Sequence, residues 1–136
     1  MAIYGISAHH NGDLSEEFIR CDEACTGYSK EENPSAHACF QRLGAEDVVF
    51  IKTFTPQNTL TVKAIGVVSS SYGVTENNLG SCVPVQWVWK GEKLIENIDD
   101  NDPLRNDIIY EEYNPWVQRE IMDLLPESYS CLPPEL

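Results

Sequence analysis

The chain has 136 residues, 42% of them hydrophobic, and carries 22 acidic against 9 basic side chains, for a formal net charge of −13. This composition excludes a disordered chain and predicts a single domain over residues 1–136, globular to residue 125 with an extended tail over 126–136. No apolar run approaches the roughly 20 residues that cross a bilayer. The N-terminus shows no secretory signal. We therefore expect a cytoplasmic protein without a membrane partner.

The charge is unevenly placed along the chain. Residues 33–91 hold three acids and four bases, a balance of +1, whereas the rest holds nineteen acids and five bases, a balance of −14. Such a surface repels phosphate over most of the molecule, which disfavours non-specific binding to duplex nucleic acid and leaves local contact through the central third open.

The first half of the chain predicts a strand, two helices and a hairpin. Residues 2–7 are typical of a strand, and apolar side chains spaced by four and three over 14–21 predict a short helix. Asn33 followed by Pro34 predicts the start of a second helix, which should run to Leu43, before Gly44.

The hairpin is the strongest local signal in the sequence. After the polar turn Gly44–Asp47, two β-rich runs, Val48–Ile51 and Leu60–Val68, flank a polar break over 55–59, which predicts an antiparallel pair. Gly66 inside the second run predicts a bulge or a close backbone approach.

The second half predicts short strands, polar loops and a final helix. Residues 73–81 and 96–107 are expected to be loops, and Lys90–Glu92 a turn. Strands are expected over 83–89, 93–95 and 108–110, with Val83, Val85, Trp87 and Trp89 on one face. Asn114-Pro115 predicts a helix over 116–125 that Pro126 ends. The order indicates an α+β fold: a small, strongly curved mixed or antiparallel sheet, or a partly open barrel, with two to three flanking helices.

Several of these segments together resemble the PUA-like superfamily, especially its EVE-type domains, over roughly residues 2–90. The matching segments are Thr26-Gly27-Tyr28 with Asn33, the helix 34–43, the turn and strand 44–50, Ala64–Val68 and Val85–Trp89. The chain departs from the family pattern where two residues separate Gly44 from Asp47.

The resemblance implies a non-catalytic module that binds a nucleobase or nucleotide in an aromatic-lined pocket, with a modified base in RNA or DNA among the expected ligands. Stacking on an aromatic side chain contributes about 1–3 kcal/mol per base. The ligand-binding residues that we expect are Tyr28, Ser29, Asn33, Lys52, Phe54, Trp87 and Trp89, with the ligand between the Tyr28 loop and the Trp87 strand. Core packing for the two tryptophans and a solvated position for Lys52 are the alternatives.

Other chemistries find less support in the sequence. Five cysteines without a secretory signal predict free buried thiols. A zinc site drawn from His9, His10, His37 and nearby cysteines lacks a second ligand knuckle, and the acidic run 99–102 is expected to be a solvated loop. No nucleophile elbow, H-E-x-x-H or P-loop pattern occurs, so we expect no catalytic residues, metal or cofactor. The alternative function is an acidic interaction protein or inhibitor that mimics nucleic-acid charge and binds a basic partner.

Overall fold

The computed structural model describes residues 2–10, 12–55, 57–69 and 74–126. Its strands are β1 (Ile3–Ile6), β2 (Glu23–Cys25), β3 (Val48–Thr55), β4 (Thr59–Val68), β5 (Thr75–Asn77), β6 (Gly80–Ile95) and β7 (Ile109–Glu111). Its helices are α1 (Ser15–Cys21), α2 (Pro34–Gln41) and α3 (Pro115–Met122), with a 3₁₀ turn η1 (Pro103–Asn106). The predicted tail beyond residue 126 lies outside the described residues.

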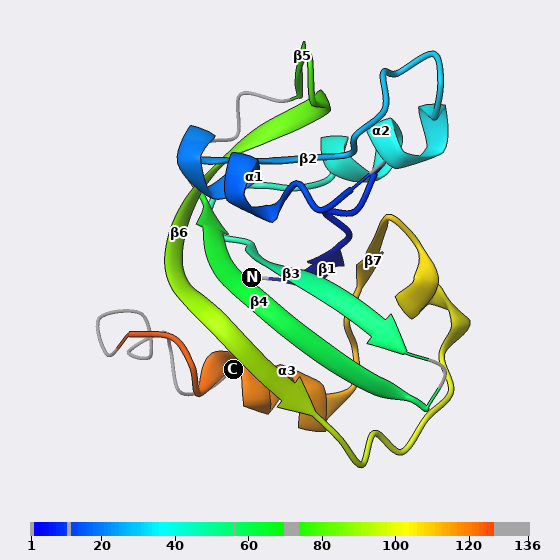
Figure 1. The fold of residues 1–136 in the computed structure, drawn as a ribbon, viewed down its shortest axis with the longest axis vertical. Helices are drawn as coiled ribbons and strands as arrows, with labels where there is room; N and C mark the ends of the chain where they lie inside the picture. Colours follow the sequence, from blue (N-terminus) through cyan, green and yellow to red (C-terminus); the bar gives the residue numbers. More distant parts are fainter. Residues whose placement is uncertain (1, 11, 56, 70–73, 127–136) are drawn as a thin grey trace.

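The strands form one mixed, strongly curved sheet in the order β2-β6-β4-β3-β1-β7, with β5 paired to β6. Only the β1–β3 pair is parallel among these strands. The 16-residue β6 bends along one side of the molecule, pairing with β2 and β5 near its start and with β4 further on (Figure 1). The predicted α+β class and the predicted antiparallel β3–β4 hairpin are confirmed.

The sheet separates two hydrophobic cores. Val49 and Ile51 of β3 belong to the first, which α1 and α2 cover with Phe18 and Phe40. The intervening residues Val48 and Phe50 belong to the second, which α3 covers with Val117 and Ile121. Alternation along β3 therefore places buried side chains on both faces, which explains the uninterrupted apolar run at 48–51.

The helix starts predicted from Asn33-Pro34 and Asn114-Pro115 are both confirmed. The Asn33 side chain accepts a hydrogen bond from the Ala36 backbone at 3.1 Å. The Asn114 side chain accepts from the Trp116 and Val117 backbones. Among the described helices, none has the length and apolar character to cross a membrane.

β5 and β6 correct two expectations about residues 73–95. The predicted loop contains β5, and the predicted turn Lys90–Glu92 lies inside an unbroken strand. Ala64 pairs with Lys90 and Val62 with Lys93, so residues 91–92 form a bulge opposite a single β4 residue. A glycine flanked by charged residues is compatible with a bulge as well as with a turn, and the long β4 partner decided between them.

A second irregularity of β6 overturns the predicted common face of Trp87 and Trp89. Gly66 pairs with Trp87 and the preceding Ile65 with Trp89, so the register shifts at this point. Trp87 packs against the first core and Trp89 against the second. A Cβ on Gly66 would lie 2.3 Å from Val85 Cγ1, which confirms the predicted close approach.

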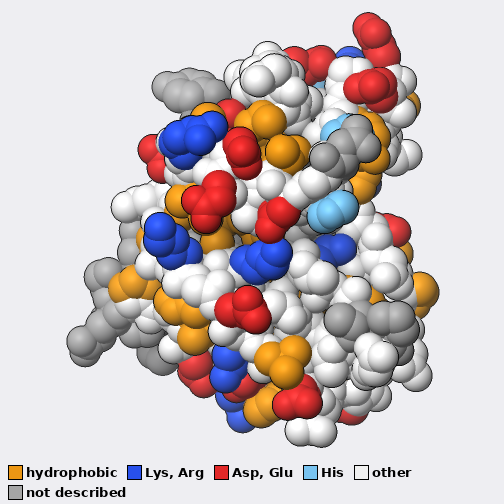
Figure 2. Space-filling view, in the orientation of Figure 1, with side chains coloured by type: hydrophobic (Ala, Val, Ile, Leu, Met, Phe, Trp, Pro, Cys, Tyr) orange, Lys and Arg blue, Asp and Glu red, His pale blue; other side chains and the backbone are white. Residues whose placement is uncertain are grey.

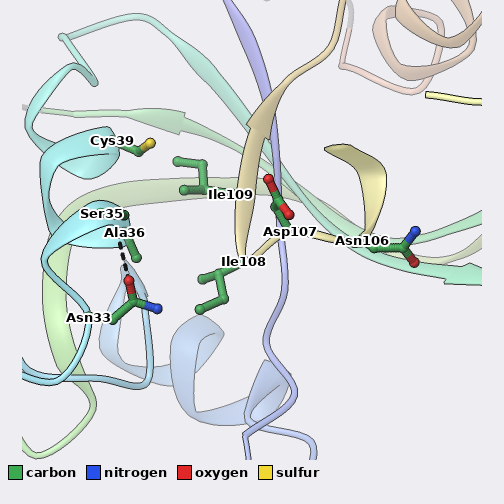
Figure 3. Close-up of a pocket in the computed structure, with 8 residues that line it drawn as sticks. All are labelled: Asn33, Ser35, Ala36, Cys39, Asn106, Asp107, Ile108 and Ile109. Atoms are coloured by element: carbon green, nitrogen blue, oxygen red, sulfur yellow. Dashed lines mark hydrogen bonds between the residues drawn. The ribbon is translucent and has the colours of Figure 1, made fainter. Parts of the chain in front are cut away.

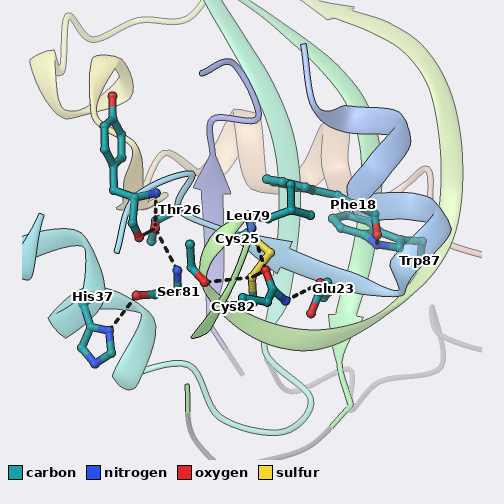
Figure 4. Close-up of a disulfide and its surroundings, with 12 residues drawn as sticks. Phe18, Glu23, Cys25, Thr26, His37, Leu79, Ser81, Cys82 and Trp87 are labelled. Atoms are coloured by element: carbon teal, nitrogen blue, oxygen red, sulfur yellow. Dashed lines mark hydrogen bonds between the residues drawn. A yellow bond between two sulfur atoms is a disulfide. The ribbon is translucent and has the colours of Figure 1, made fainter. Parts of the chain in front are cut away.

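The expectation of free buried thiols is wrong for the described cysteines. Cys25 and Cys82 face each other in the β2–β6 ladder and form a disulfide (Figure 4). Cys21 and Cys39 are free, but Cys21 is exposed and Cys39 is half-buried. The two bonded cysteines are 57 positions apart, and only strand pairing reveals that they are neighbours.

Candidate functional site

A cavity of about 220 Å³ opens where β1 ends, between β3 and the segment that leads into β7. Ile6 pairs with Ile51, and the Ser7 backbone donates to the Ile108 carbonyl, so both neighbours flank the chain as it leaves β1. We call this the Lys52 cavity; its walls are Ser7, His9, Lys52, Thr53, Phe54, Arg105 and Asn106.

The cavity lies on a face where basic and histidine side chains meet. Figure 2 shows Lys and Arg side chains near the middle of this face, with a His side chain beside them. A small adjoining hollow shares His9, Lys52 and Thr53 with the cavity and adds Lys63, which is paired to Asp13 at 2.9 Å. This cluster is noteworthy because the chain as a whole carries a charge of −13.

Lys52 is buried, with 6% of its surface exposed. Its Nζ donates to the Arg105 carbonyl at 2.6 Å and to the Asp107 carbonyl at 2.7 Å, and lies 5.7 Å from the centre of the Tyr110 ring. Burial lowers the pKa of Lys52 to about 8, against a smaller opposing effect of the Asp107 charge. The alternative of a solvated strand lysine does not describe this residue.

A buried ionic network shapes the wall that carries these carbonyls. The Arg105 side chain, fully buried, donates to Glu112 at 3.0 and 2.7 Å and also pairs with Asp100. Glu112, 1% exposed, also accepts from the Tyr110 hydroxyl at 2.7 Å. The network thereby fixes the loop from residue 99 to 107 against the end of β7.

The network shifts the titration of its members in opposite directions. Burial, followed by the Glu112 charge, raises the pKa of Tyr110. The hydrogen bond from Arg105 lowers the pKa of Asp100. Desolvation acts to lower the pKa of Arg105, but hydrogen bonds to Glu112 and Asp100 outweigh it and raise that pKa. The shifts of Asp100 and Arg105 favour the charged form of each. The expectation that residues 99–102 form a merely solvated loop is wrong for Asp100, which pairs with the buried Arg105.

A second, larger cavity of about 370 Å³ adjoins the first through Asn106. Figure 3 shows α2 on one side of it and residues 107–109 on the other, with Ala36 and the two isoleucines forming apolar walls. We call it the Asn33 cavity; the remaining wall residues are Asn33, Ser35, Cys39, Asn106 and Asp107.

The structure brings together some of the expected ligand-binding residues and separates others. Lys52 and Phe54 share the Lys52 cavity, and Asn33 lines the neighbouring one. Tyr28, Ser29, Trp87 and Trp89 line neither. Trp87 is half-buried and donates its indole N–H to the Phe18 carbonyl at 3.1 Å.

The Tyr28 loop is held by its own contacts. The Tyr28 ring packs edge-on against His10 with ring centres 4.2 Å apart. Its backbone carbonyl accepts from the Thr26 hydroxyl at 2.6 Å and from the Ser81 backbone at 3.0 Å. Ser29 and Glu32 exchange hydrogen bonds between side chain and backbone. These contacts order the loop beside the disulfide, around Thr26 and Ser81 in Figure 4.

Residues considered for a zinc site, and set aside in the sequence analysis, make other contacts. His37 shares a hydrogen bond of 2.8 Å with the buried Ser81 hydroxyl, and Cys25 is in the disulfide. Glu23, Cys25 and Cys82 place donor atoms within 4.8 Å of one another, yet the two sulfurs are bonded together.

Five wall residues of the Lys52 cavity were missed from the sequence: Ser7, His9, Thr53, Arg105 and Asn106. Ser7 and His9 directly follow a predicted strand, a position where loop residues often carry binding groups, and this signal could have found them. Arg105 and Asn106 gave no such signal, because they reach the site through the β1–β7 pairing. No protein-family model and no curated protein sequence matches this chain.

Proposed function

We propose that the protein is a non-catalytic binding module for a nucleobase or nucleotide, in the manner of PUA-like domains, and that the ligand enters the Lys52 cavity. One observation carries this proposal: the cavity combines an aromatic ring, a buried cation and short polar side chains on an otherwise acidic chain. This relocates the ligand from the cleft between the Tyr28 loop and the Trp87 strand, since neither residue lines the cavity.

Phe54 provides the stacking surface in this proposal. It is half-buried at the cavity wall, and stacking on such a ring contributes about 1–3 kcal/mol per base. Lys52 has three N–H donors when charged, and two bind carbonyls, so the third is available for a base carbonyl or a phosphate oxygen. Ser7, Thr53 and Asn106 add polar groups that can pair with a base edge.

The Asn33 cavity extends the site in this proposal. Its apolar walls and amide and hydroxyl groups suit a flanking sugar or base. The exposed Asp107 carboxylate disfavours a phosphate there. If the target base belongs to a nucleic acid, it must leave its stack, at a cost of a few kcal/mol that the pocket contacts offset.

A thermal-shift screen of the intact chain against nucleosides, modified nucleobases and short oligonucleotides tests the proposal. A ligand at 100 times its dissociation constant adds about 2.7 kcal/mol of apparent stability. We expect Phe54→Ala to weaken binding by about tenfold or more, and Tyr28→Ala, the matched aromatic control outside the cavity, to leave it within about twofold.

Two outcomes would contradict this assignment. Loss of binding in Tyr28→Ala but not in Phe54→Ala would return the ligand to the Tyr28 loop. If no base or nucleotide in the screen shifts the unfolding temperature, the nucleobase function is rejected.

The charge distribution supports a second candidate function, an acidic interaction protein that binds a basic partner. This candidate rests on the net charge of −14 carried by the residues outside 33–91. Binding of a basic partner that weakens steeply with salt, without any nucleotide affinity, would favour it. We also propose a cytoplasmic location; the Cys25–Cys82 disulfide weighs against this, because disulfides are most frequent in oxidising compartments.

A further inference from the structure

We propose that the Lys52 amine is a nucleophile that captures a small aldehyde as a Schiff base within the Lys52 cavity. This inference goes beyond nucleobase recognition and does not depend on it. It is an activity of one side chain, and it requires an amine that is neutral, reachable and correctly oriented.

The orientation comes from the two carbonyls that hold Nζ. A neutral lysine amine has two N–H bonds and one lone pair. The Arg105 and Asp107 carbonyls lie 2.6 and 2.7 Å from Nζ and can accept both hydrogens. The lone pair then occupies the remaining tetrahedral position, and within the described part of the chain no donor hydrogen-bonds to it.

Access comes from the cavity itself. Lys52 is 6% exposed and lines both the Lys52 cavity and the hollow beside it. At about 220 Å³ the cavity lies below the 300–1,000 Å³ usual for drug-sized ligands. It has room for an aldehyde of a few carbons, and Ser7 and Thr53 can bind a hydroxyl on that aldehyde.

The charges around the amine leave it without an ion-pair partner in the described structure. The Arg105 guanidinium is neutralised by Glu112 and Asp100, and Lys63 by Asp13. Asp107 acts on Lys52 only through space and raises its pKa less than burial lowers it, leaving the pKa at about 8. His9, which lines the same cavity, is the remaining titratable neighbour. About one amine in ten is then neutral at pH 7, far more than for a solvated lysine.

The chemistry balances without an added oxidant or reductant. The amine lone pair forms a bond to the aldehyde carbon, and the carbonyl oxygen takes up a proton to give a carbinolamine. The nitrogen loses a proton, and the hydroxyl group leaves as water, so that amine and aldehyde give an imine and one water. In this proposal His9, which also lines the cavity, relays the proton between nitrogen and oxygen.

Reductive trapping in the intact protein tests the inference. The chain is incubated with glycolaldehyde and sodium cyanoborohydride, which converts each imine to a stable hydroxyethyl-lysine, and the modified lysines are located by peptide mass spectrometry. At pH 7 we expect Lys52 to react about tenfold faster than Lys90, an exposed lysine on β6 that serves as an internal control. The Lys52 rate should reach half its maximum near pH 8.

Because the internal comparison uses the unaltered chain, it does not depend on whether a variant folds. A Lys52→Arg variant, which retains donors to the carbonyls but no nucleophilic amine, should lose the fast adduct. Labelling of Lys52 that is no faster than that of Lys90, or that rises only near pH 10, would overturn the proposal. Nucleoside binding measured in parallel separates the outcomes: loss of that binding alone would reject the proposed function and leave this inference standing.

Discussion

Arg105 stabilises the wall of the Lys52 cavity through its buried pairs with Glu112 and Asp100. Removing one member of a buried ion pair leaves an uncompensated charge, which costs about 3–5 kcal/mol. We expect Glu112→Gln to lower the free energy of unfolding by about 3 kcal/mol in urea titrations. The half-buried Lys93–Glu120 pair, at 3.5 Å, is the control, and Glu120→Gln should cost less than about 1 kcal/mol. Equal losses in both variants would contradict the special role of the buried network.

Lys52 predicts a specific pH dependence of stability. Its pKa is about 8 in the folded chain, below the value of about 10.4 for an unfolded lysine, so the unfolded state binds more protons between these values. The free energy of unfolding should therefore gain a rising contribution from Lys52 as pH increases from 8 towards 10, whereas below pH 8 the full penalty of its burial is present. Urea titrations across this range should show a flatter profile for Lys52→Met. Parallel profiles for the two proteins would contradict the lowered pKa.

Gly66 is required by a close contact and not by its backbone angles. A Cβ at this position would lie 2.3 Å from Val85 Cγ1 and 2.8 Å from Trp87 Cε3. We expect Gly66→Ala to destabilise the protein by about 1–3 kcal/mol through overpacking. Gly44→Ala is the matched control, because its Cβ would meet nothing closer than an Asp47 oxygen at 3.8 Å. Thermal unfolding of both variants tests this, and an unchanged melting temperature for Gly66→Ala would refute the crowding.

At the scale of elements, two helix caps with the same sequence signal differ in their surroundings. The Asn33 side chain caps α2 through the Ala36 backbone. Asn33→Asp, which keeps the acceptor, should change stability little, whereas Asn33→Ala should cost about 1 kcal/mol. The Asn114 amide also donates to Asp99 and Asp100 at 2.8 and 2.7 Å. Asn114→Asp should therefore destabilise as much as Asn114→Ala, about 2 kcal/mol or more, because it replaces those donors with a third carboxylate. Chemical unfolding that ranks the two aspartate variants equally would contradict this difference.

At the scale of the whole molecule, the Cys25–Cys82 disulfide links the first quarter of the chain to β6. It closes a loop of 57 residues, for which the chain-entropy model gives a stabilisation of about 4 kcal/mol. We expect both cysteines to resist a thiol reagent in urea until a reductant is added. Cys25→Ser should lower the unfolding midpoint markedly, whereas Cys21→Ser, at an exposed free cysteine, should not. Reaction of Cys25 and Cys82 without reduction would contradict the pairing.

Much of the fold is encoded by local signals. Asn-Pro pairs marked the starts of α2 and α3, and the two β-rich runs marked the β3–β4 hairpin, because caps and strand propensity act over a few residues. Local signals failed within β6. The Lys-Gly-Glu run has the composition of a turn, but pairing along the full length of β4 keeps the strand continuous and converts it to a bulge.

The candidate site depended far more on tertiary structure than the fold did. Lys52 and Phe54 were identified by residue type and strand parity, but the groups that define their environment come from other parts of the chain. Parallel pairing of β1 with β3 places Ser7 beside Lys52, and antiparallel pairing of β1 with β7 brings the Arg105 and Asp107 carbonyls to its amine. Local propensities and capping therefore determined the elements, whereas long-range strand pairing alone decided the disulfide, the separation of Trp87 from Trp89 and the burial of Lys52. The physical reason is that these features depend on atoms distant in sequence, whose proximity follows only from the register of the sheet.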